Sequence, residues 1–469
     1  MPWSHRPRIG LLVGVALGLS LPGCKAKPQP APAPTRTPSA HPSAAPPAPE
    51  RCREVGPGPS LTVGEAERAP RAAAEDADAG DEEEDQAELP FAARVEAAVA
   101  LGSEFAMGGL STQGGKTEAF VALVPFDGKP GRRVGLGPVH GDVDPPLVAG
   151  RAASLLVATA DMDAGGGMLR LTRLPAGADK TSGELSITGV DHDAGAALAE
   201  GEHGALLVWG AASKHGVALK ALGVDPETLA GPGPALDLKG TLGAESPVLL
   251  ARPGGYWLAW VSEEPLADAG AHRDAGVHAG LAARGAAGLS KDGGASEEVG
   301  SLLDAGPRTL LALPLDGAGK PLAAPRAVSA RARVVGFAAA LSADGALALT
   351  WRNDEASPGV ENGPPELARV ALDGAVLRGK MDDEELTAGT PALVADPKAG
   401  GRVWVGLESA SEGTRVGLLA ASGLGLEALT GDRLLRGAEL LAAGEGKLLV
   451  GRSRGRAVEL EVLECKPSP

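Results

Sequence analysis

The stretch Ala346-Leu347-Ala348-Leu349-Thr350-Trp351, with the turn Leu372-Asp373-Gly374 after it, shows the pattern that decides the fold. The run is short and apolar, follows a glycine-containing turn, and has the length of one β-strand. Asp-Gly is a favoured dipeptide for the tight turn of a β-hairpin. The stretch therefore predicts short antiparallel strands joined by hairpins.

Runs of the same kind recur along the chain about 50 residues apart. The exception is the step of 90 residues between Tyr256 and Ala346, which contains a low-complexity insertion at about 267–306. Removing that insertion restores the common spacing. The seven runs begin at Phe105, Leu155, Leu206, Tyr256, Ala346, Val403 and Leu448.

A meander of four short strands at this period is typical of one β-propeller blade. We therefore expect an all-β chain in which residues 91–469 form a single β-propeller of seven blades; six or eight also fit the spacing. The last repeat ends after one further strand near Ala457 and lacks a fourth. Residues 51–66 have the pattern of a fourth strand, and we expect this N-terminal segment to close the last blade.

The chain contains three cysteines, Cys24, Cys52 and Cys465. Cys52 and Cys465 lie near opposite ends of the predicted propeller, where a disulfide would staple the ring. The alternative is a pair of unrelated buried thiols. Export from the cytoplasm would make such a disulfide chemically reasonable.

The N-terminus has the features of an export signal. Basic residues precede Ile9–Leu21, an apolar stretch too short to span a bilayer. Leu21-Pro22-Gly23-Cys24 resembles the lipobox of bacterial lipoproteins. The resemblance implies that residues 1–23 are a signal peptide, that Cys24 is lipidated, and that Lys25 directs the protein to the outer membrane. The alternative is ordinary secretion with a free or paired cysteine.

Two segments of biased composition follow. Residues 24–50 are rich in proline and alanine and are expected to form an extended tether. Residues 67–90 carry nine acidic side chains between Glu75 and Glu88, within a chain of net charge −16. We expect a disordered loop there, with calcium or a basic partner as the alternatives. Nucleic acid is excluded as a partner because phosphate binding requires a positive stripe, which the sequence lacks.

Paired aspartates are the weak candidates for a metal site. Asp161 with Asp163 and Asp191 with Asp193 could supply oxygen ligands to calcium, although Asp-Ala-Gly is also ordinary turn chemistry. Gly451-Arg452-Ser453-Arg454-Gly455 matches the pattern of a nucleophilic serine, but an alternating strand follows it and no histidine lies downstream. The sequence therefore predicts no catalytic residue and no cofactor.

These observations leave two classes of function. The first is a membrane-anchored lipoprotein that acts as a non-catalytic binding or scaffold module of the cell envelope and contacts another envelope protein or cell-surface component. The second is a propeller enzyme, quinoprotein-like or glycan-active, with its site at the central channel. Carboxylates or histidines converging in the channel would favour the enzyme, and an apolar or glycine-lined channel would favour the scaffold.

Overall fold

The computed structural model describes most of the predicted propeller and divides the chain into two units, Met1–Pro49 and Glu50–Pro469. The predicted signal peptide (1–23), the tether (24–50), the acidic loop (67–90) and the insertion (267–306) lie outside the described residues. The structure describes residues 52–63, 93–113, 115–151, 154–163, 166–231, 233–263, 307–330, 332, 334–353, 365–380, 388–396, 401–409, 413–420, 423–429, 438–454 and 457–465.

Four sheets are four-stranded antiparallel meanders in which chain order is also the order across the sheet. The first consists of β3 (Ala93–Leu101), β4 (Glu104–Gln113), β5 (Lys116–Pro125) and β6 (Arg132–Val139). The second consists of β15 (Ala244–Arg252), β16 (Gly255–Ser262), β17 (Thr309–Asp316) and β18 (Arg326–Ala327). The remaining two are β19 (Val334–Leu341), β20 (Leu347–Asn353), β21 (Glu366–Val370) and β22 (Val376–Lys380), and then β23 (Ala388–Asp396), β24 (Arg402–Ser409), β25 (Gly413–Leu419) and β26 (Leu426–Leu429).

An eight-stranded sheet contains two further meanders. Only one residue pair joins them: Val190 of β10 pairs with Ala211 of β12. One meander is β7 (Leu147–Gly150), β8 (Ser154–Asp163), β9 (Gly166–Pro175) and β10 (Ser182–Val190), and the other is β11 (Ala196–Gly201), β12 (Gly204–Ser213), β13 (Gly216–Val224) and β14 (Leu236–Asp237).

The last sheet combines the two ends of the described chain. Its C-terminal strands are β27 (Glu439–Gly444), β28 (Lys447–Arg454) and β29 (Ala457–Cys465). Both β1 (Cys52–Glu54) and β2 (Leu61–Val63) pair antiparallel with β29. The N-terminal segment therefore contributes two short strands, where the sequence predicted one.

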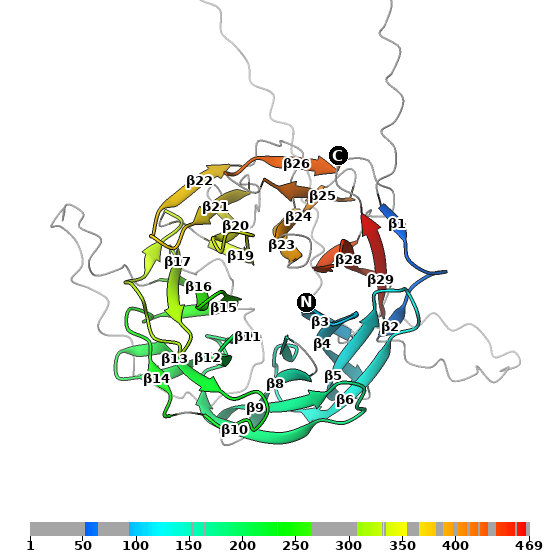
Figure 1. Ribbon diagram of the computed structural model, residues 1–469. Helices are drawn as coiled ribbons and strands as arrows, with labels where there is room; N and C mark the ends of the chain where they lie inside the picture. Colours follow the sequence, from blue (N-terminus) through cyan, green and yellow to red (C-terminus); the bar gives the residue numbers. More distant parts are fainter. Residues whose placement is uncertain are drawn as a thin grey trace, which may run out of the picture. The chain divides into compact units, whose positions relative to one another are not determined.

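The meanders pack against one another through their first strands. β3 contacts β7, and the contacts continue through β11, β15, β19, β23 and β27, which in turn contacts β3. Figure 1 shows these first strands toward the centre and the later strands of each meander toward the outside. The unit Glu50–Pro469 is therefore an all-β, single β-propeller.

Burial explains why the second strand β16 is apolar over nearly its whole length instead of alternating. Every residue of β16 is buried, because a sheet in a propeller is covered on both faces by its neighbours. Trp209, Trp260 and Trp351, which end equivalent runs of the sequence, are all buried. Their indole rings therefore fill the space between sheets.

Hydrogen bonds also join the sheets at their first hairpin turns. Tyr256 Oη donates to the Gly204 carbonyl at 2.8 Å, and Trp257 Nε1 donates to the Gly345 carbonyl at 3.0 Å. The Asp396 carboxylate, which is fully buried, accepts the N–H groups of Glu445 and Gly446. Each bond satisfies a buried polar group and fixes the position of the next sheet.

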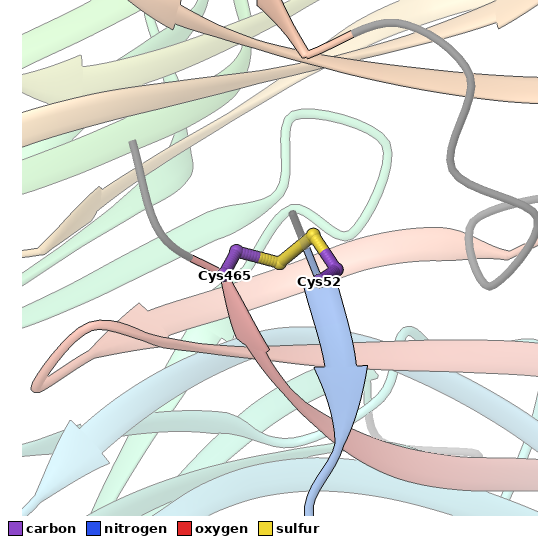
Figure 2. The surroundings of a disulfide bond; sticks show 2 residues. All are labelled: Cys52 and Cys465. Atoms are coloured by element: carbon purple, nitrogen blue, oxygen red, sulfur yellow. A yellow bond between two sulfur atoms is a disulfide. The ribbon is translucent and has the colours of Figure 1, made fainter. Parts of the chain in front are cut away.

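A disulfide joins Cys52 to Cys465, as the cysteine positions predicted (Figure 2). The two residues are paired directly across β1 and β29, with their Cα atoms 4.1 Å apart and a sequence separation of 413. Beside them, the Arg53 guanidinium forms an ion pair with Glu464. The bond therefore covalently joins the first described strand to the last.

We predict that the double variant Cys52→Ser, Cys465→Ser has a free energy of unfolding about 2 to 5 kcal/mol lower than the parent chain, because its unfolded ensemble is no longer cross-linked. Urea denaturation without reductant measures this difference. Cys24→Ser is the control and should leave the midpoint unchanged. Equal midpoints for the double variant and the parent would show that the bond does not stabilise the fold.

Candidate functional site

The antiparallel order of the meanders gives the propeller two distinct faces. On one, here called the entry face, segments 140–146 and 191–195 lead into the first strands β7 and β11. The opposite face, here called the turn face, carries the turns from first to second strand and from third to fourth strand, such as 253–254 and 371–375. Each candidate group can be assigned to one of these faces.

The first strands form the innermost layer of the propeller (Figure 1), and their partly exposed side chains are mainly small and apolar. Charged residues with described side chains occur near the strand ends, as with Glu200, Glu245 and Asp396. Apolar side chains provide contact area and no group for proton transfer. The partly exposed apolar residues include Val99, Ala196, Val248, Leu250, Ala338, Ala339 and Ala395.

A cluster of charged groups lies on the entry face at the start of β15. Arg308 places Nη2 3.0 Å from Glu245 Oε2 and Nε 3.7 Å from Glu263 Oε1. Burial raises the pKa of Glu245 above its ordinary value; Arg308 opposes the rise, whereas the nearby Glu263 and Asp193 carboxylates add to it. The cluster thus combines a carboxyl that holds its proton more strongly than usual with a second carboxylate and a guanidinium.

The backbone beside this cluster departs from regular strand geometry. Ser246 has a φ of 51°, in the left-handed region, at a register shift between Glu245 and Val248. Its N–H donates to the Ala194 carbonyl at 3.0 Å. The bulge joins the segment that contains Asp193 to β15, and it brings Asp193 near Glu245.

Two of the four aspartates predicted as calcium candidates accept hydrogen bonds from nearby groups. Asp161 Oδ1 accepts the His140 N–H at 2.9 Å and lies 3.0 Å from His140 Nδ1. Asp191 Oδ1 accepts the Ala194 N–H at 3.2 Å, which is turn chemistry. Asp163 ends β8, and Asp193 lies in the connection to β11. Over the described part of the chain, no three His, Cys, Asp or Glu side chains are grouped so that they could hold a metal ion.

A shallow hollow lies beside these aspartates on the entry face. Its floor is apolar and includes Leu147, Ala158 and Leu169, and its edge includes Asp191 and His192. The His192 ring packs on Gly167, where an added Cβ would come within 2.6 Å of Nε2. The imidazole ring of His192 therefore packs on the backbone beside the hollow and forms part of its lining.

Sequence reasoning missed Glu245, Arg308 and His192 as members of these sites. Glu245 interrupts an apolar first strand directly before Ser246-Pro247, and this interruption was the available signal. Arg308 follows the insertion and carried no comparable signal. Ser453 of the Gly-Arg-Ser-Arg-Gly motif lies within strand β28, and strand β29 follows it.

Comparison with known proteins finds similar solved structures of low sequence identity. No protein-family model and no curated protein matches the chain. The β-propeller domain of the Trilobed protease from Pyrococcus furiosus is 8% identical with a TM-score of 0.46, and the alignment covers 80% of this chain and 94% of that one. The polysaccharide lyase Uly1 is 10% identical with a TM-score of 0.48, covering 79% and 90%.

The acylaminoacyl peptidase of Pyrococcus horikoshii is 9% identical with a TM-score of 0.44; the alignment covers 77% of this chain and 49% of that one. The chain thus spans about half the length of that peptidase. These neighbours include two proteases and a polysaccharide lyase, and likenesses at this identity and TM-score carry no statement about the activity of this chain. Within the described ranges, no helix has the length and apolar character needed to cross a bilayer.

We predict that Glu245→Gln reduces the loss of stability as the pH rises from 4 to 7. A raised pKa in the folded state means that the unfolded chain releases this proton first, at its ordinary value of 4.5. The contribution of Glu245 to stability is therefore full below pH 4.5 and is lost as the pH rises through its folded pKa. Urea denaturation at several pH values measures the effect.

Glu263→Gln is the matched control, since it removes a more exposed carboxylate from the same guanidinium. It should keep most of the pH dependence of the parent chain. Identical pH profiles for Glu245→Gln and the parent would contradict the assigned role of Glu245.

Proposed function

We propose that this chain is an exported, lipid-anchored β-propeller that acts as a non-catalytic binding or scaffold module of the cell envelope. The observation that carries the proposal is the Cys52–Cys465 disulfide. Disulfides form and persist in oxidising compartments such as the periplasm and the cell surface, and are rare in the cytosol. The bond thus supports export independently of the N-terminal sequence.

The anchor in this proposal is Cys24, which follows the apolar stretch Ile9–Leu21. Two or more acyl chains would hold the protein on a membrane, because each buried CH₂ contributes about 0.8 kcal/mol. Residues 24–50 would then be the tether, with the outer membrane as the location. The partner would be another envelope protein or a cell-surface component.

The apolar first strands favour binding over catalysis. Small apolar side chains on the innermost layer offer contact area and shape, whereas acid–base catalysis needs titratable groups within reach of a substrate. One observation favours the alternative of a propeller enzyme, quinoprotein-like or glycan-active. Glu245 and Glu263 both lie against the Arg308 guanidinium on the entry face. Most glycoside hydrolases use a pair of carboxyl groups for catalysis.

We further propose that the propeller has seven blades and is closed by the N-terminal segment. The eight-stranded sheet counts as two blades because one residue pair joins its two meanders. The continuous contacts among first strands, which return from β27 to β3, support this count. The pairing of β1 and β2 with β29 supports closure.

We predict that Cys24→Ser moves the protein out of the membrane-anchored state. In a diderm bacterium, the parent chain should partition with membranes and carry an added mass at Cys24 that matches its acyl chains. The variant should lack that mass and keep residues 1–23. Cys52→Ser is the control and should remain acylated. An unmodified Cys24 in the mature parent protein would exclude the anchor.

We predict that charge-neutral variants of the entry-face carboxyls preserve function in the cell. If loss of the protein causes an envelope defect, the double variant Glu245→Gln, Glu263→Gln should complement that defect as well as the parent chain does. Immunoblotting of membrane fractions checks that the variant is present at equal amounts. Failure of a stable, correctly located double variant would favour the propeller enzyme.

A further inference from the structure

Exposed apolar side chains gather at one place on the rim of the propeller. Among the described residues, the large apolar side chains with substantial exposure are Met162 at 40%, Leu322 at 58%, Leu372 at 49% and Leu377 at 50%. Leu322 lies in the connection between β17 and β18, Leu372 in the turn between β21 and β22, and Leu377 in β22 itself. Three of the four thus belong to the outer strands of two successive sheets.

The topology places these leucines on the same face. The β17–β18 and β21–β22 connections both join a third strand to a fourth, so both lie on the turn face. Two contacts tie them together: Arg378 Nη2 donates to the Ala327 carbonyl at 2.8 Å, and Gly374 packs against the Arg326 side chain. We call this surface the leucine rim. It comprises Leu322, Leu372 and Leu377 with the exposed residues Pro321, Ala323, Ala324 and Ala375.

Cationic side chains surround the leucine rim. Lys320, Arg326 and Arg378 are exposed there. The nearby acidic side chains are Asp316 and Asp373, whose Oδ1 atoms accept backbone N–H groups of their own turns. The local charge is therefore slightly positive on a chain whose net charge is −16. Leucines bordered by lysine and arginine suit the boundary between the headgroups and acyl chains of an anionic bilayer.

We propose that the leucine rim docks on an anionic lipid surface, as a second and weaker contact beside the acyl anchor. The inference rests on the proposed anchoring through Cys24. Three half-exposed leucines and a small positive surplus give weak binding by themselves, because stable attachment normally needs more than one signal. A tether converts the weak contact into an intramolecular one, with an effective concentration in the millimolar range for a short flexible linker.

The tether would give the propeller a long reach from its anchor. Residues 24–50 could extend to roughly 80 Å at about 3.1 Å per residue. Docking through the turn face would leave the entry face, with Glu245 and Arg308, directed away from the lipid. The rim would thus set the orientation in which the propeller meets its partner.

The first test uses the mature chain from residue 24 with Cys24→Ser, which removes the acyl chains and the apolar signal stretch. Every described strand lies in the separate unit Glu50–Pro469, so the propeller is retained. Co-sedimentation compares vesicles of phosphatidylcholine with vesicles containing 30 mol% phosphatidylglycerol. We expect weak binding that is at least threefold stronger to the anionic vesicles and falls as salt is added.

The variant Leu322→Asp, Leu372→Asp, Leu377→Asp should reduce binding to anionic vesicles at least fivefold. Met162→Asp is the matched control, because Met162 is similarly exposed and lies in β8, outside the rim. It should bind as the parent does. Near-ultraviolet circular dichroism verifies that each variant keeps its tryptophans packed. Equal vesicle binding by the triple variant and the parent would overturn the proposal.

The second test uses the lipidated chain on vesicles and separates failure of the rim from failure of the anchor. Hydrogen exchange of residues 320–324 and 371–378 should slow at least threefold on anionic vesicles, while the segment around Met162 stays unchanged. An acylated protein without this protection would overturn the rim and leave the anchor intact. Protection that requires an added envelope protein and is absent on lipid alone would assign the leucine rim to a protein partner and overturn lipid docking.

Discussion

The structure depends on the need of each sheet to cover both of its faces. A sheet such as β15–β18, whose second strand is buried along its whole length, would expose a large apolar area on both sides if it stood alone. Neighbouring sheets remove that area from water, and the sheets at the two ends of the row gain the same protection only where they meet. β27 contacts β3, and β29 pairs with β1 and β2 within the last sheet. The disulfide joins Cys52 of β1 to Cys465 of β29 within the last sheet, so the N-terminal strand cannot leave that sheet unless the bond is reduced.

The repeating parts of this fold could be predicted because they depend on short stretches of local sequence. Local sequence decides where apolar runs, glycine turns and Asp-Gly hairpins occur. Their regular spacing predicted the repeating meanders of the β-propeller. The disulfide was predictable for a different reason. An unfinished last repeat and two terminal cysteines point to one junction, and the structure pairs Cys52 with Cys465 in register.

The charged groups could not be predicted in the same way, because they depend on contacts between distant residues. Arg308, directly before β17, forms an ion pair with Glu245 at the start of β15, two strands away in the same sheet. In the sequence, the insertion lies between them. The carboxylate of Asp161 accepts a hydrogen bond from the backbone N–H of His140, which lies in the connection before β7. The sequence around either residue does not indicate this contact. Nothing in the periodic pattern distinguishes a carboxylate that caps a turn from one that meets a ligand. A charged residue inside an apolar first strand, such as Glu245, is the one signal that could have been used.

The two faces of the propeller differ in chemistry, and that difference bears on how an anchored module could work. The entry face holds Asp191, Asp193, Glu245 and Glu263 with a guanidinium among them, whereas the turn face carries the leucine rim with its surrounding cations. An acyl chain on a flexible tether limits the distance from the membrane and leaves rotation free. A weak second contact restricts rotation at little energetic cost, because the tether has already brought the surfaces together. If the rim supplies that contact, the entry face is directed away from the lipid in every molecule, and a partner meets the propeller in one orientation.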